Sequence, residues 1–220
     1  MDSGSFPVDL ILFAMIAAFL VLRLRGILGK RTGFERPAVV PPPAAAAQAP
    51  IIEARAEPMS GPRTAHILPD PTSAAAQALL AMRRAGNFDP EQFLNGAAQA
   101  FAMIVGAFAA GDRATLQPLL SAEMFAAFGE AIDARLARGE TQKSELRGIS
   151  EIRIVGASLK DSLASIELRI VSDQISLTLD HAGQPVSGTD AMTELTDIWS
   201  FERDLTAADP TWRLTGARNA

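Results

Sequence analysis

Residues 164–179 read ASIELRIVSDQISLTL, and apolar and polar side chains alternate in two parts of this stretch. A period of two is typical of strands that bury one face in an antiparallel sheet. Strands of this character are predicted at residues 151–154, 164–170, 175–179, 192–204 and 212–218. The glycines and proline of Asp180–Asp190 predict a hairpin connection between two of them.

Three helices are predicted before these strands. The first covers residues 73–85 and stops at Gly86-Asn87, and the second begins at Asp89-Pro90-Glu91, where a capping acid precedes a proline. The second helix has a broad apolar face from Phe93 to Phe108, which indicates burial against a sheet. Helices followed by an antiparallel sheet predict an α+β domain at residues 73–220.

The third predicted helix begins at Ser121 and ends at Gly139. Its predicted buried stripe consists of Phe125, Phe128, Ile132 and Leu136. Four charged residues are predicted to face elsewhere, namely Glu130, Asp133, Arg135 and Arg138. A short helical turn that Pro118 interrupts is expected before this helix.

The segment before the domain has a different composition. Nine of the chain's 14 prolines lie between residues 35 and 72, together with the run Ala44–Ala47. Such a composition favours extended, disordered chain, so residues 29–72 are predicted to be a basic flank and linker. The apolar pairs Ile51-Ile52 and Ile67-Leu68 are either chance islands in this linker or a docking patch for a partner.

An apolar run of 13 residues, Leu10–Leu22, lies near the N-terminus. Extended to residues 6–28, it is long enough for a transmembrane helix. Acidic residues precede the run, and Arg23, Arg25, Lys30 and Arg31 follow it, which is the reverse of a signal peptide. The positive-inside rule therefore predicts a single-pass anchor with the N-terminus outside and the domain in the cytoplasm. A helix lying in the membrane interface and a buried helix are the alternatives.

Composition excludes several classes of function. The chain has no Cys, which excludes disulfides, thiolate metal sites and a cysteine nucleophile, and its net charge of −5 argues against nucleic-acid binding. The absence of Tyr removes one oxyanion donor of a ketosteroid-isomerase-like site. His181 is predicted in a hairpin turn. We therefore expect no catalytic residues, no metal site and no cofactor.

Two strand motifs carry a family resemblance. Trp199-Ser200-Phe201-Glu202-Arg203 and Asp209-Pro210-Thr211-Trp212-Arg213-Leu214, with the helix from Phe93 to Gly111-Asp112, resemble the Tim44-like domain family. The acidic N-terminus, anchor, basic cluster and Pro/Ala linker resemble its bacterial membrane-anchored members. The resemblance implies a cone-shaped antiparallel sheet of the nuclear-transport-factor-two-like type, wrapped on a long helix and holding a large apolar pocket.

The resemblance also implies work at a membrane. Mitochondrial relatives attach to the inner membrane and link a protein-conducting channel to a DnaK-type chaperone, and a related group holds ribosomes there. This chain lacks their long, charged chaperone-binding region and has the predicted anchor instead. The expected partners are the membrane, a protein of the translocation or insertion machinery or a chaperone, and a lipid. The expected location is the bacterial inner membrane.

Pocket residues follow from the resemblance and the apolar pattern. The expected pocket walls are Phe101, Ile104, Phe108, Phe125, Trp199, Phe201 and Trp212. The alternative for Trp199, Phe201 and Trp212 is a place in the core, and the two roles can coincide at a cavity wall. Asp197 shares a strand face with Trp199 and Phe201, so it is either a pocket carboxylate or a residue at a bulge, at the mouth or paired with an arginine. Arg83 and Arg84 form either a solvated helix end or a contact with anionic lipid.

Two classes of function remain after these exclusions. The first is a non-enzymatic membrane-anchored adaptor that docks protein partners in membrane-protein biogenesis or translocation. The alternative is a protein that binds a lipid or another hydrophobic ligand in the pocket. An open pocket ringed with apolar side chains favours ligand binding, whereas a filled cone favours docking.

Overall fold

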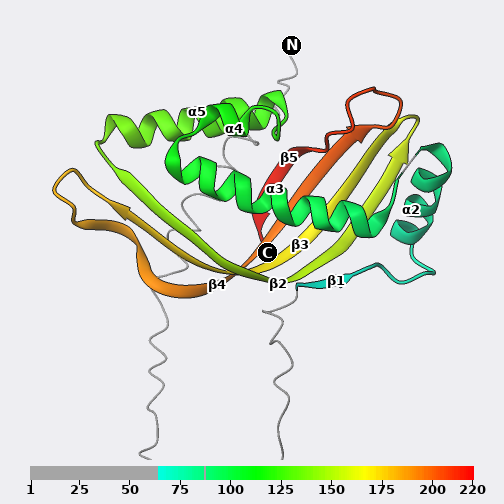
Figure 1. Cartoon of the computed structure of the whole chain (residues 1–220), viewed down its shortest axis with the longest axis horizontal. Coiled ribbons are helices and arrows are strands. Elements are labelled where there is room, and N and C mark those ends of the chain that lie inside the picture. Colours follow the sequence, from blue (N-terminus) through cyan, green and yellow to red (C-terminus); the bar gives the residue numbers. More distant parts are fainter. Residues whose placement is uncertain (1–63, 87) are drawn as a thin grey trace, which may run out of the picture.

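The computed structural model describes residues 64–86 and 88–220 (Figure 1). The predicted anchor at 6–28 and residues 29–63 of the predicted linker lie outside the described residues. The described chain folds into the elements β1 (Ala65–Ile67), α2 (Ala74–Ala85), α3 (Pro90–Ala110), α4 (Arg113–Leu116), α5 (Ala122–Ala137), β2 (Thr141–Lys160), β3 (Leu163–Leu179), β4 (Pro185–Asp204) and β5 (Arg213–Asn219).

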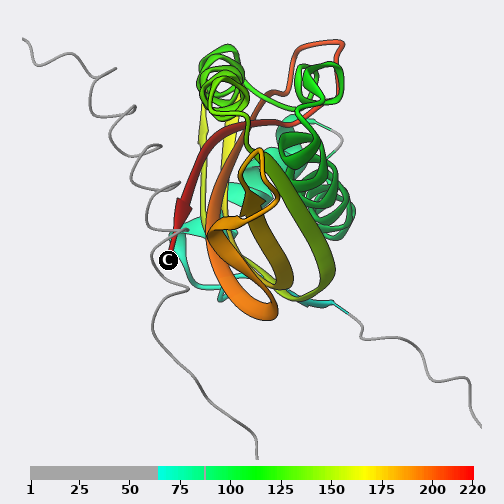
Figure 2. The same cartoon turned by 90° about the vertical axis from the view of Figure 1, so that its left-hand side faces the viewer.

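The strands form one five-stranded sheet in the order β1-β2-β3-β4-β5. β1 pairs with β2 in parallel, and the remaining neighbours pair antiparallel. α3 crosses in front of the sheet in Figure 1, and Figure 2 shows the strands curving around it. The predicted order of helices followed by antiparallel strands is thus confirmed for α2–α5 and β2–β5, whereas β1 precedes the helices and adds a parallel edge strand, and the domain is α+β.

α3 is the central element of the core. Its N-terminus is fixed by Asp89, whose side chain accepts a hydrogen bond of 2.8 Å from the Gln92 amide, and Pro90 is its first residue. Its C-terminus is fixed by Gly111, whose φ of 72° is costly for other residues. The buried face of α3 packs on apolar side chains of β2, β3 and β4. Among the described residues α3 alone has the length and hydropathy of a membrane span, but half of it is buried, as in a core helix.

The folded domain begins earlier than predicted. Thr64 donates a hydrogen bond of 2.9 Å to the carbonyl of Ile149, and Ile67 pairs with Arg153 of β2. His66 lies 3.0 Å from the carboxylate of Glu91 in the first turn of α3. The prediction of linker was therefore wrong for the last residues before 73, because backbone pairing with an edge strand orders a segment whose composition favours disorder.

The predicted strands 164–170 and 175–179 are one strand, β3. Ser172 and Gln174 continue the buried alternation with polar side chains, at 0% and 1% exposure. The register with β4 shifts between Gln174 and Ser176, so the apolar residues change parity there. The predicted connection Asp180–Asp190 is also shorter in the structure, because β4 begins at Pro185 after a tight turn.

The buried stripe of α5 differs from the predicted stripe at one position. Leu136 was predicted to be buried but is 61% exposed, whereas Arg135 is 7% exposed. The Arg135 guanidinium donates hydrogen bonds of 3.0 Å to the carbonyls of Phe108 and Ala109, at the end of α3. The last carbonyls of a helix lack amide donors from the helix itself. The Phe108 carbonyl also accepts a hydrogen bond of 3.2 Å from the Gly111 amide, and the guanidinium adds further donors at this end, which explains why the charged residue takes the inner position.

Candidate functional site

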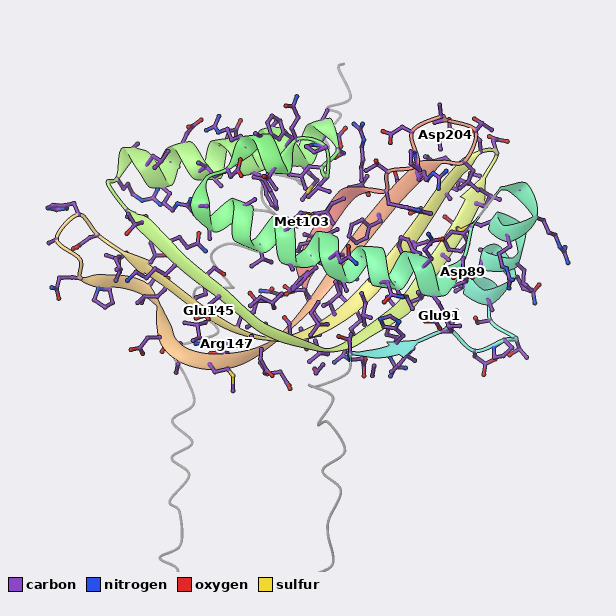
Figure 3. The ribbon with its side chains drawn as sticks, in the orientation of Figure 1. Asp89, Glu91, Met103, Glu145, Arg147 and Asp204 are labelled. Atoms are coloured by element: carbon purple, nitrogen blue, oxygen red, sulfur yellow. The ribbon has the colours of Figure 1, made fainter. Side chains whose placement is uncertain are left out.

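A cleft of about 410 Å³ opens beside the N-terminal half of α3. One wall comes from α3, and the other comes from β4, from the segment that joins β4 to β5 and from Leu119. Asp89 and Met103 lie along α3 at the two ends of this wall (Figure 3). The cleft is lined by Phe88, Asp89, Gln92, Phe93, Gly96, Ala97, Gln99, Ala100, Met103, Leu119, Phe201, Arg203, Pro210, Thr211 and Trp212.

Aromatic rings form the apolar part of the cleft. The rings of Phe93 and Trp212 lie 4.7 Å apart, centroid to centroid, in an edge-to-face arrangement. Phe88 lies 5.7 Å from Trp212, and Phe201 lies 6.1 Å from Phe93. Such contacts are favourable for aromatic pairs and hold the rings in place. The cleft therefore has a preformed apolar wall.

One cation lies in the cleft. Arg203 is on β4 two residues after Phe201, so strand alternation places both on the same face. The Nε atom of Arg203 is buried and has no hydrogen-bond partner among the residues that the structure describes. The other charged residue of the lining, Asp89, accepts the capping hydrogen bond of α3.

The seven predicted pocket residues do not line one cavity. Phe201 and Trp212 line the cleft. Phe101, Ile104 and Trp199 belong to the closed core at 0%, 1% and 3% exposure. Phe101 lies 4.6 Å from Trp199, centroid to centroid, so these rings fill the middle of the cone.

The other two predicted pocket residues lie elsewhere. Phe108 packs against Phe128 at 5.0 Å near the C-terminal end of α3, where it lines a separate hollow with Arg135. Phe125 is half-buried and packs against the core from α5. The space between α3 and the curved sheet is thus filled in its middle and open at the end where α3 begins.

Asp197 lies on β4 and is 3% exposed. It pairs in register with Ile170 and Asn219, among buried strand positions, and it does not belong to the cleft lining. The irregularity between β4 and β5 falls between Ser200 and Phe201, so Asp197 is not at that bulge.

A small polar cluster is buried on β3. The Gln174 side-chain amide donates a hydrogen bond of 2.8 Å to the Ser172 hydroxyl, and both residues are buried. Ile170 of β3 is the register partner of Asp197 on β4, so Ser172 and Gln174 follow that partner along β3. The buried face of β3 therefore carries polar as well as apolar side chains.

The remaining candidates lie on the surface. Arg83 and Arg84 are exposed in the last turn of α2, where positive charge favours the helix dipole. His181 is exposed in the turn between β3 and β4, as predicted. Within residues 64–86 and 88–220, no group of three or more His, Cys, Asp or Glu residues is arranged to hold a metal ion.

Sequence reasoning missed most of the cleft lining. Phe88 precedes the cap of α3, and Phe93 was predicted only as part of a buried helix face. Arg203 was predicted to be part of the strand motif, and the alternation that places Trp199 and Phe201 on one face also places Arg203 there. The strand alternation was therefore the signal in the sequence that could have placed Arg203 in the cleft.

The fold and the cleft define an α+β domain with a curved sheet around a core helix and a partly open interior. The model of the Tim44-like domain family matches residues 75–219. The chain therefore belongs to the Tim44-like domain family, and this membership indicates a membrane-associated role in protein interaction. No curated protein matches the sequence.

Several solved structures are similar to part of the chain at low identity. The intermembrane space region of the chloroplast protein ARC6 is 10% identical, with a TM-score of 0.43, over 57% of this chain and 95% of that one. A protein of the NTF2-like family from Streptomyces avermitilis is 12% identical, with a TM-score of 0.31, over 59% and 96%. A conserved protein from Planctomyces limnophilus is 14% identical, with a TM-score of 0.29, over 59% and 94%.

Proposed function

We propose that this protein is a non-enzymatic adaptor anchored in the bacterial inner membrane, which docks protein partners in membrane-protein biogenesis or translocation. The observation that carries the proposal is the family match over residues 75–219, joined to the predicted anchor at 6–28. In this arrangement the domain is held on the cytoplasmic side by residues 29–63.

The chemistry of the domain supports a role without catalysis. The one histidine of residues 73–220, His181, lies in an exposed turn far along the chain from the cleft residues of α3. The cleft itself offers one arginine and one capping aspartate among aromatic and amide side chains. These groups are suited to binding and orienting a partner or ligand, and they include no nucleophile paired with a base.

Site-specific photo-crosslinking in the native membrane tests the adaptor proposal. A photoreactive residue at Met103, which is 47% exposed at the cleft, is compared with one at Val155, which is 43% exposed on β2. We expect a discrete adduct with a protein of the insertion or translocation machinery from position 103 and none from 155. Equal yields of the same adducts from both positions would contradict a specific docking site.

Topology is tested separately. Deletion of residues 6–28 is expected to release the protein from the membrane, and a reporter fused after Ala220 is expected to be active only in the cytoplasm. Activity of that reporter outside the cytoplasm would overturn the proposed orientation, and membrane retention after the deletion would overturn the anchor.

A second candidate function is the binding of a hydrophobic ligand. The observation that favours it is the open cleft, which is ringed by Phe88, Phe93, Phe201 and Trp212 instead of being filled by them. Its volume of about 410 Å³ lies in the range of small-molecule sites. The two functions are compatible if ligand and partner use different parts of the surface.

A further inference from the structure

The cleft has a charged group as well as an apolar wall, and the two together define a ligand. We infer that the cleft binds a single-chain amphiphile with a carboxylate head, a free fatty acid, whose head pairs with Arg203. This inference rests on the second candidate function, because it names the ligand class of the same cleft.

Arg203 is the first line of evidence. A half-buried arginine in an apolar lining is stabilised by an anion that accepts hydrogen bonds from its guanidinium. The Nε atom of Arg203 is buried without an acceptor among the described residues, and the guanidinium forms none of the ion pairs found among them. By contrast Arg213, on the neighbouring strand, pairs with Asp209 at 3.3 Å. Because the Nε atom is itself covered by protein, a ligand acceptor in the cleft would pair with the terminal nitrogens of this half-buried guanidinium.

The apolar wall is the second line of evidence. Phe201 lies two residues before Arg203 on the same face of β4, so a head group at the arginine lies beside the aromatic rings. From there the cleft continues along α3 to Met103, past Gly96 and Ala100. A Cβ built at Gly96 meets no atom within 4 Å, which shows that this part of the wall is open. A flexible alkyl chain fits such a path.

Size limits the ligand to one chain. A volume of about 410 Å³ is that of roughly 14 water molecules at about 30 Å³ each. A methylene group occupies a volume of similar order, so the cleft accommodates one alkyl chain of moderate length. The two chains of a phospholipid exceed it.

Charge limits the head group to a monoanion. Arg203 is the one cation in the lining, and Asp89 places a carboxylate at the other wall. A carboxylate matches the planar fork of a guanidinium and carries one charge. A phosphate monoester carries nearly two charges and would be repelled by Asp89. Gln92 and Gln99 supply amide groups that bind either head without favouring charge.

The test uses the full chain held in amphipol, with brominated alkyl probes that quench tryptophan fluorescence on contact. The chain has two tryptophans, and Trp212 lines the cleft whereas Trp199 is buried in the core. At pH 8 we expect 11-bromoundecanoate to quench at concentrations about tenfold or more below 11-bromoundecanol, which is the ratio expected for one charge-assisted hydrogen bond. Trp212→Phe is expected to remove most of the quenching.

Arg203→Met is expected to abolish the preference for the acid, so that both probes bind like the alcohol. Arg213→Met is the matched control, because Arg213 does not line the cleft, and it should keep the preference. Retained near-native tryptophan emission in both variants shows that they are folded.

The possible failures are distinguishable. Equal binding of acid and alcohol by the parent chain, or an unchanged preference in Arg203→Met, would overturn the carboxylate assignment and leave the apolar cleft as a binding site. Tighter binding of bromoundecyl phosphate than of the acid would also overturn it. Absence of quenching by every probe would refute both this inference and the ligand-binding function.

Discussion

Arg135 closes the C-terminal end of α3, and its replacement gives a quantitative test of that role. Its guanidinium donates two hydrogen bonds of 3.0 Å to the carbonyls of Phe108 and Ala109 and a third to the side chain of Gln142. It also lies 5.4 Å from the centroid of the Phe108 ring, in a cation–π contact. Burial lowers the pKa of Arg135 by desolvation, and the nearby charge of Glu140 partly offsets this effect. Desolvation of the guanidinium therefore reduces the stability that its hydrogen bonds contribute.

Arg135→Met keeps the length and apolar stem of the side chain and removes all its donors. Hydrogen bonds to charged groups contribute about 1.5–3 kcal/mol each. The two carbonyl bonds therefore stabilise the fold by about 3–6 kcal/mol, from which the desolvation of the guanidinium must be subtracted. We expect a net loss of about 3 kcal/mol, or roughly 6–12 °C in Tm for a domain of this size.

Urea unfolding of the full chain, followed by tryptophan fluorescence, measures this loss, because both tryptophans lie in the domain. Arg138→Met is the control. Arg138 is exposed and pairs with Glu140 at 2.8 Å, and exposed pairs contribute at most about 1 kcal/mol. Should Arg135→Met cost no more than Arg138→Met, the reasoning that the buried arginine stabilises α3 would be wrong.

Three further expectations follow from particular contacts. Gly188→Ala should destabilise the domain by more than about 2 kcal/mol in urea unfolding, because the new Cβ would lie 2.1 Å from the Ser176 carbonyl oxygen at a φ of 83°. Gly183→Ala is the control and should cost about 1 kcal/mol, because Gly183 has open space around it. Similar losses in the two variants would contradict the clash at Gly188. The pKa of Glu151 is lowered, first by its hydrogen bond from Arg153, so this pair adds stability above the unfolded pKa that is lost as pH falls through the folded one. Glu151→Gln should therefore lower the urea midpoint at pH 7 and leave it almost unchanged at pH 3. A fragment 64–220 should unfold at higher urea than 73–220, since only the longer one contains β1; equal midpoints would show that β1 contributes nothing.

Local signals in the sequence were sufficient for most of the elements. Asp89-Pro90 begins α3, and Ser121 begins α5, since each cap satisfies an amide that the helix itself leaves free. The alternation from Ala164 to Ile170 gave the buried face of β3. These features depend on neighbours a few residues away, and the pattern of a single chain records them.

Features that depend on distant partners were not predictable in the same way. β1 lies in a proline-rich segment and is ordered by pairing with β2, more than eighty residues later. Arg135 is buried because the end of α3 needs donors, which no periodicity within α5 reveals. The cleft is a further case, since it depends on where residues 210–212 lie relative to the first turns of α3.

The two ends of α3 differ, and this difference bears on how the domain would work beside a membrane. The C-terminal end is closed by Arg135, whereas the N-terminal end carries the cleft and, through Glu91 and His66, contacts the strand at which the described chain begins. β1, where the described chain begins, therefore lies beside the first turn of α3.

The net charge of the domain and the predicted linker then limit which molecules can reach the cleft. Residues 73–220 carry a net charge of −6, so an anionic membrane surface repels the domain as a whole. The predicted linker has 35 residues, which span roughly 33 Å as a flexible coil and roughly 110 Å if fully extended like polyproline. In the proposed arrangement such a tether would keep the domain close to membrane-derived ligands and membrane proteins without adsorption of the domain. In the proposed arrangement an apolar wall that carries one arginine and one aspartate would then select among them by shape and charge.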